Sequence, residues 1–292
     1  MSHNTFSSGP GVPGSSARWR RVLLHPLARM VWASVAMVLA LALCFALIEA
    51  LVPKNLRHNW PNLIAALACV LGYWVYVNRF ERRPVVEISP SGAPIEWARG
   101  AALGVLLGVL TLLPLWGLGV YRIDGIGDSA QLVKLLPEMV FVSVMEELLI
   151  RGVIFRIAEE AWGSWRALAL STLVFVAAHL PGEISVMGML VTAAASLALT
   201  AAYQISRRLW LPMGMHFAWN YVFSAVFSIA VSGHEAKGLL NSSMSGPAWL
   251  SGGAYGVEAS AMALLVWAAA AAILLRRADA RGEFRARIRC PA

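Results

Sequence analysis

Long apolar segments alternate with short polar ones along the chain. The apolar segments cover about residues 27–52, 60–78, 101–120, 136–158, 166–180, 184–206, 212–232 and 255–275. A helix needs roughly 20 apolar residues to cross a bilayer, and of these segments only 166–180 is clearly short. The pattern therefore predicts an all-α fold, a polytopic membrane helix bundle of about eight transmembrane helices.

The composition agrees with a membrane protein. Of 292 residues, 59% are hydrophobic and 14% are charged, whereas a soluble domain has about 25% charged residues. Residues 1–17 are rich in Ser, Gly and Pro and are expected to form a disordered N-terminal tail. The helix bundle is expected over residues 18–275, followed by a basic cytoplasmic C-terminal tail over 276–292. The Ser-rich segment 241–251 is expected to be a simple connector.

Basic residues are shared unevenly between the polar segments. With a cytoplasmic N-terminus, 19 of the 24 Lys and Arg residues fall in cytoplasmic segments. The other five are Lys54, Arg57, Arg122, Lys134 and Lys237. Because cytoplasmic loops carry an excess of Lys and Arg, this distribution predicts that both termini are cytoplasmic. The Ala and Arg richness of the chain further suggests the inner membrane of a bacterial cell.

The same distribution argues against nucleic acid as a partner. The net charge is +8, but it arises mainly from arginines that lie between apolar runs rather than on one face. The partner expected from the apolar segments is the lipid bilayer.

Two acidic residues and an arginine interrupt the apolar segment 136–158. Glu147 and Arg151 are four residues apart, so on a helix they share a face and can pair. Glu146 points about 100° away and has no partner nearby in the sequence. A buried carboxylate without a partner suits a general base. We therefore expect Glu147 and Arg151 to support a site in which Glu146 does the chemistry.

Two histidines lie inside apolar segments, His179 and His216. Phe175 precedes His179 by one helical turn, so its ring can pack against the imidazole and orient it. Asn220 follows His216 by one turn, and both can donate hydrogen bonds to one point in the bundle. Polar groups within membrane spans are costly and usually face the bundle interior. The remaining histidines lie in tails or loops and are expected at the surface: His3, His25, His58 and His234.

The three patterns, Glu-Glu-x-x-x-Arg, Phe-x-x-x-His and His-x-x-x-Asn, resemble in this order the CPBP family of intramembrane proteases. That family comprises the CAAX prenyl endopeptidases and the Abi, or bacteriocin-processing, proteins. The resemblance covers about residues 130–225, including the segment Arg207-Arg208-Leu209-Trp210-Leu211-Pro212 before His216. It implies a helical-bundle endopeptidase whose active site opens toward the cytoplasm and whose substrates are polypeptides, lipidated ones included.

The resemblance also implies roles for individual residues. Glu146 and His179 would activate a water for attack on the scissile carbonyl. His216 and Asn220 would stabilise the tetrahedral oxyanion, which suits donors held in a dry site. Glu147, Arg151 and Phe175 would support them.

The sequence leaves open whether a cofactor takes part. Glu146, His179 and His216 would make a plausible three-ligand set for zinc or another divalent metal. However, no His-Glu-x-x-His pair is present, and the same residues suffice for a metal-free, glutamate-based mechanism.

Two other functions compete with proteolysis. One is a non-catalytic membrane scaffold or bacteriocin-immunity-type protein of the same fold, which would have no need to keep every ionisable group. The other is a transporter or channel that uses the buried carboxylates as an ion relay. The chain shows no internal repeat of the kind many transporters have.

Overall fold

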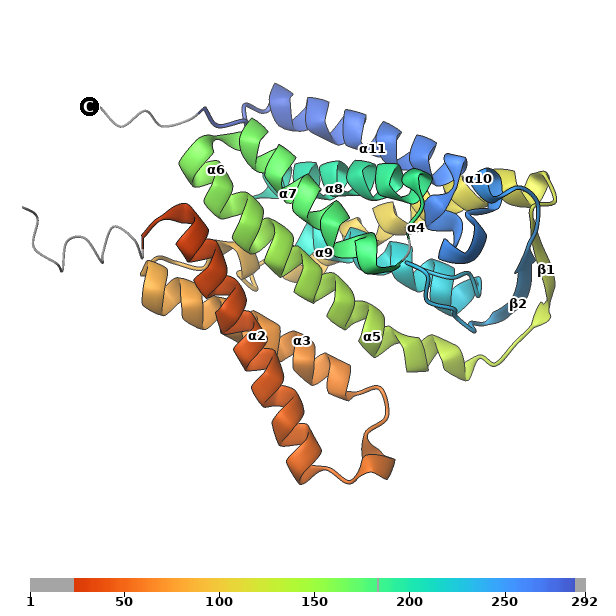
Figure 1. The fold of residues 1–292 in the computed structure, drawn as a ribbon, viewed down its shortest axis with the longest axis horizontal. Helices are drawn as coiled ribbons and strands as arrows, with labels where there is room; N and C mark the ends of the chain where they lie inside the picture. The colour runs from red at the N-terminus through yellow and green to blue at the C-terminus, as the bar shows by residue number, and fades with distance from the viewer. Residues whose placement is uncertain (1–23, 183, 287–292) are drawn as a thin grey trace, which may run out of the picture.

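The structure is a computed structural model that describes residues 24–182 and 184–286, and it is mostly helical (Figure 1). The longer helices are α2 (Pro26–Leu51), α3 (Pro61–Tyr76), α4 (Ala93–Gly117), α5 (Ala130–Glu147), α6 (Arg156–Trp162), α7 (Ser164–His179), α8 (Val186–Ser206), α9 (Trp210–Tyr221) and α11 (Ala261–Ala280). The tail predicted over residues 1–17 lies outside the described residues, as do the last six residues of the basic tail.

Short helical turns connect or extend these helices. The π-helical turns are Val77–Glu81, Leu148–Phe155 and Val222–Val226, and α10 is a single α turn, Ala248–Ser251. The 3₁₀ turns are Lys54–Leu56, Val86–Ile88, Leu180–Gly182, Gly253–Tyr255 and Val257–Ala259.

Each apolar segment of the sequence forms a helix, but the count of eight membrane spans is not confirmed. Among the described residues, five helices are long and apolar enough to cross a membrane: α2, α3 with its π turn (Pro61–Glu81), α4, α8 and α11. The other three segments fall on α5 with α6, on α7 and on α9. With 16 and 12 residues, α7 and α9 are short, while α5 carries several ionisable residues. These three helices also carry the polar motifs.

The buried apolar side chains form two clusters. One joins α2, α3, α5 and α7 and includes Tyr73 and Leu148. The other joins α4, α8, α9 and α11 and includes Trp219 and Trp267. Where the two clusters meet, α5 packs against α9 and α7 packs against α8. The polar motifs therefore lie in the interior of the bundle, as the cost of exposing them to lipid requires.

Glycines let α4 and α9 approach closely. A Cβ atom on Gly100 would lie 2.1 Å from the carbonyl oxygen of Leu211, and one on Gly214 would lie 2.2 Å from that of Trp97. Small residues at a helix–helix contact allow the backbones to meet in this way. This contact fixes the position of α9, which carries His216 and Asn220.

A wide helical turn follows the first motif. The π turn Leu148–Phe155 continues α5 directly into α6, so the three elements form one continuous rod (Figure 1). The carbonyl oxygen of Gly152 accepts hydrogen bonds from the Tyr73 hydroxyl (3.1 Å) and from Nε of Arg156 (2.8 Å). Such turns leave backbone groups that side chains can satisfy, and they are frequent at functional sites.

The fold is not purely α-helical. Strands β1 (Tyr121–Ile126) and β2 (Leu240–Met244) pair antiparallel, with Tyr121 opposite Met244. They lie at one end of the bundle, beside α10 (Figure 1). The segment 241–251, expected to be a simple connector, therefore contains most of a strand and the turn α10. Pairing across more than 100 residues leaves no local signal that could have predicted it.

Candidate active site

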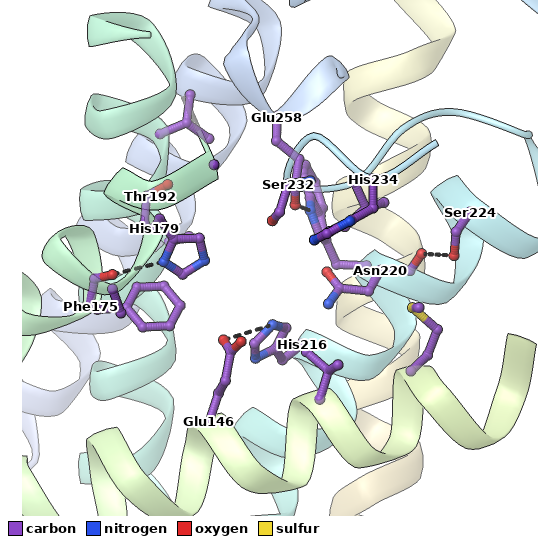
Figure 2. Close-up of a pocket in the computed structure, with 18 of the residues that line it drawn as sticks. Glu146, Phe175, His179, Thr192, His216, Asn220, Ser224, Ser232, His234 and Glu258 are labelled. Atoms are coloured by element: carbon purple, nitrogen blue, oxygen red, sulfur yellow. Dashed lines mark hydrogen bonds and ion pairs between the residues drawn. The ribbon is translucent and has the colours of Figure 1, made fainter. Parts of the chain in front are cut away.

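A cavity of about 660 Å³ lies between α5, α7, α8 and α9 and is completed by residues 231–236 and 255–258. The residues of all three polar patterns that line it are Glu146, Phe175, His179, His216 and Asn220. Figure 2 shows Glu146 and His216 on one side of the cavity, with His179 and Asn220 facing each other across it. Residues from three separate segments of the sequence thus meet around one space.

Glu146 presents a carboxylate to this cavity from the last turn of α5. Its Oε2 atom is buried and has no hydrogen-bond partner within the described residues. The His216 imidazole lies close to it, with Nε2 at 3.8 Å from the Glu146 Oε2 atom. That separation is too long for a hydrogen bond. The Glu146 carboxylate can therefore accept a proton from a third group in the cavity.

Glu147 and Arg151 form the ion pair predicted from their spacing. Arg151 Nη1 lies 2.8 Å from Glu147 Oε1, and both side chains have no exposed surface. Arg151 also donates to the hydroxyl of Thr200 (3.3 Å) and to the carbonyl oxygen of Ser196 (3.1 Å), both on α8. Its guanidinium lies 4.8 Å above the centre of the Phe175 ring. Arg151 thereby fixes the relative positions of α5, α7 and α8 behind the cavity.

A hydrogen bond from His216 to Glu147 joins the first and third motifs. His216 Nδ1 donates to Glu147 Oε1 at 2.9 Å. Because a carboxylate can only accept when it is ionised, Nδ1 carries a proton and the Nε2 atom is directed at the cavity. No spacing in the sequence predicted this contact.

His179 is oriented by its own helix. Its Nδ1 donates to the carbonyl oxygen of Phe175 at 2.8 Å, and the two rings lie 4.6 Å apart between centroids. Packing of the Phe175 ring against the imidazole agrees with the spacing-based prediction. In a neutral ring with the proton on Nδ1, Nε2 is an acceptor. Figure 2 shows the imidazole directed into the cavity.

Asn220 lies one turn after His216 on α9 and is almost fully buried. Its backbone carbonyl accepts a hydrogen bond from the Ser224 hydroxyl at 2.6 Å, and its amide faces the cavity (Figure 2). The Asn220 amide is a neutral hydrogen-bond donor one helical turn after His216, as the sequence pattern suggested.

Sequence reasoning missed Glu258, which lies in the turn Val257–Ala259 before α11. Its Oε1 accepts from Trp219 Nε1 at 2.7 Å, and its Oε2 accepts from the backbone N–H (2.6 Å) and hydroxyl (3.0 Å) of Ser232. Glu258, Ser232 and His234 all line the cavity. His234 is exposed as predicted, but it is part of the cavity wall. The available signal for Glu258 was a carboxylate near the start of the apolar segment 255–275.

The suggested metal ligands do not form a metal site in this arrangement. Within residues 24–182 and 184–286, no three His, Cys, Asp or Glu side chains are grouped so that they could hold a metal ion. Glu146, His179 and His216 line the same cavity but are not such a group. We therefore assign no chemical step to a metal.

The comparison with protein families agrees with the motifs. Residues 128–222 match the family model described as type II CAAX prenyl endopeptidase Rce1-like. This segment is similar to that family. It includes every residue of the three polar patterns, and the resemblance to the CPBP family is confirmed over it. Glu258 lies outside the matched residues. No curated protein and no solved structure matches the chain.

The Rce1-like match and the apolar helices together indicate an integral membrane protein that is similar to the CAAX proteases over residues 128–222. The match covers about a third of the chain. The helices α2 to α4 and α11 lie outside it, and they supply most of the helices long enough to cross a membrane.

Proposed function

We propose that this protein is an intramembrane endopeptidase that hydrolyses peptide bonds of membrane-associated or lipidated polypeptides. The observation that carries the proposal is the half-buried Glu146 side chain in the cavity wall, whose Oε2 atom is buried without a hydrogen-bond partner in the described structure while two imidazoles face the same space. A carboxylate in this situation can take a proton from a water molecule that attacks a carbonyl carbon.

The first step would use Glu146 and His179. Glu146 takes a proton from the water as its oxygen bonds to the scissile carbonyl carbon, and the electrons of the C=O bond move onto the carbonyl oxygen. His179, held by Phe175 with Nε2 as an acceptor, orients the same water. The proton on Glu146 then passes to the leaving nitrogen as the C–N bond breaks, which restores the carboxylate.

Stabilisation of the oxyanion would fall to His216 and Asn220. The Asn220 amide is a donor in any state, whereas Nε2 of His216 donates only when the ring carries both protons, because Nδ1 is already committed to Glu147. In that state the carboxylates of Glu146 and Glu147 balance the charges of His216 and Arg151. Donors fixed in a site with little water stabilise an oxyanion strongly.

A comparison of membrane-protein fragments tests the proposal and does not require an identified substrate. Cells that express the wild type, Glu146→Gln or Glu138→Gln are compared by mass spectrometry of membrane-derived peptides. Glu138 is a suitable control because it lines the same cavity from the same helix but is exposed. We expect fragments that depend on the wild type to fall at least about 100-fold with Glu146→Gln and to remain with Glu138→Gln.

The opposite result would favour a scaffold. If no fragment depends on the wild type, or if all of them persist with Glu146→Gln at equal protein levels, the protein does not act as a glutamate-dependent endopeptidase.

A further inference from the structure

The cavity reaches the surface at the end of the bundle that carries the ribbon β1–β2. The exposed residues that line it are Glu138 in the middle of α5, Ala178 at the end of α7, Pro181 and Gly182 after it, and His234 and Glu235 before β2. The residues at its opposite limit are buried, among them Ile150 and Leu199. The mouth of the cavity therefore lies among the loops 180–182 and 231–236, which we call the loop end of the bundle.

The other end of the bundle is closed by ion pairs. The helix ends there are the start of α2 and α9 and the end of α6, α8 and α11 (Figure 1). Arg156, almost fully buried, lies 3.0 Å from Glu81, 3.6 Å from Glu87 and 2.8 Å from Glu160. This arginine connects α6 to the π turn after α3 and to the turn Val86–Ile88.

A second group of ion pairs covers α8, α9 and the end of α11. Arg207 pairs with the buried Glu159 and with Glu283, and Arg208 lies 3.0 Å from Glu96. The chain after α11 is also bound to the start of α7, because the backbone N–H of Arg285 donates to the Ser164 hydroxyl at 2.8 Å. None of these paired residues lines the cavity, so the cavity does not open at this end.

The distribution of charge indicates which end faces the cytoplasm. Among the described residues, most arginines lie at the closed end, whereas the basic residues toward the loop end are Lys54, Arg57, Arg122, Lys134 and Lys237. An excess of Lys and Arg marks the cytoplasmic side of a membrane protein. The closed end is then cytoplasmic, and the mouth of the cavity lies on the opposite side.

We propose that the cavity opens on the non-cytoplasmic side of the membrane and receives polypeptide segments presented from that side. The polypeptide nature of the substrate rests on the proposed function, whereas the side on which the cavity opens does not. It departs from the cytoplasmic opening that the family resemblance implied. The substrates would be exported or membrane-anchored chains with their cleavage site beyond the bilayer, whereas a lipidated chain end held in the cytoplasm would meet the closed end.

Cysteine labelling in intact cells tests the inference. The native cysteines are replaced (Cys44→Ala, Cys69→Ala and Cys290→Ala), and a single cysteine is introduced at either end of the bundle. Ala236→Cys places it in the cavity wall near the mouth, and Ala280→Cys places it on an exposed position at the end of α11. A membrane-impermeant maleimide is applied before and after permeabilisation, and both full-length variants are checked for wild-type levels in the membrane.

We expect Ala236→Cys to be labelled equally before and after permeabilisation, and Ala280→Cys to be labelled only afterwards. The reverse pattern would overturn the inference, because the cavity would then open to the cytoplasm. If neither variant were labelled in intact cells, the mouth would be closed and the inference would be overturned. If both were labelled, the orientation would be mixed, which would overturn it as well. Labelling does not require catalysis, so a loss of the proposed protease activity would leave this result unaffected.

Discussion

His216 and Arg151 donate to the same oxygen atom, Oε1 of Glu147, at 2.9 and 2.8 Å. One buried carboxylate thus joins the arginine of its own helical rod to the imidazole of α9. The neighbouring residue, Glu146, has the same side chain but faces the cavity. Two adjacent glutamates therefore have different tasks, one holding the bundle together and the other available for chemistry.

Substitution Glu147→Gln is expected to reduce stability strongly. The change keeps the size of the side chain but leaves the guanidinium of Arg151 without a counter-charge in a place with no exposed surface. Breaking a buried ion pair on one side costs about 3–5 kcal/mol. Thermal unfolding of purified protein in detergent should show a clearly lower Tm.

The matched control is Glu146→Gln, one residue earlier on the same helix. The Oε2 atom of Glu146 has no hydrogen-bond partner in the described structure and the side chain is partly exposed, so the Tm of this variant should stay near that of the wild type. Equal Tm values for the two variants would mean that Glu147 does not hold the structure as proposed.

Substitution Gly100→Ala is expected to disturb the contact between α4 and α9. The added Cβ would lie 2.1 Å from the carbonyl oxygen of Leu211, which is backbone and cannot turn away. Overpacking of this kind costs about 1–3 kcal/mol, and the displaced α9 would also move His216. Both Tm and wild-type-dependent fragment production should fall.

Gly117→Ala in the same helix provides the comparison. A Cβ at this position meets nothing within 4 Å, so stability should be unchanged. If Gly100→Ala were tolerated as well as Gly117→Ala, the close approach of α4 and α9 would not be needed to place the site.

Local spacing was sufficient to predict the parts of the site that lie within one helix. The pairing of Glu147 with Arg151 and the packing of Phe175 on His179 are both contacts between residues four apart, which share a helix face. The separation of Glu146 from Glu147 followed from the same geometry. These contacts depend on helix periodicity alone.

Contacts between distant segments could not be predicted in this way. His216 and Glu147 are 69 residues apart in the chain, and Glu258 and Trp219 are 39 apart. Neither pair has a periodic signal, because the packing of α9 against its neighbours decides them. The number of membrane spans could not be predicted from the sequence either. The helices that carry the polar motifs are apolar enough to resemble spans, but they are short or contain charged residues.

Removal of divalent metals should leave activity unchanged. Glu146, His179 and His216 are not grouped so that they could hold an ion, and the proposed steps need only their proton-accepting and donating atoms. Wild-type protein in vesicles is treated with EDTA or 1,10-phenanthroline, and its metal content is measured by mass spectrometry. Stoichiometric zinc in the purified protein, together with activity that chelation abolishes and zinc restores, would show that the site rearranges around a metal.

Substitution Glu258→Gln should loosen the wall of the cavity without unfolding the bundle. The carboxylate uses both oxygens, one for Trp219 Nε1 and one for the N–H and hydroxyl of Ser232, and an amide can replace only one of these acceptors. Losing an acceptor for buried donors costs about 1–3 kcal/mol. We expect faster hydrogen exchange at the Ser232 amide, fewer wild-type-dependent fragments and a Tm lowered by a few degrees. Glu235→Gln, exposed at the same mouth, controls for the loss of a negative charge. If the hydrogen-exchange rate at the Ser232 amide were equal in the two variants, Glu258 would not position the segment 231–236. Packing alone would then hold that segment in the cavity wall.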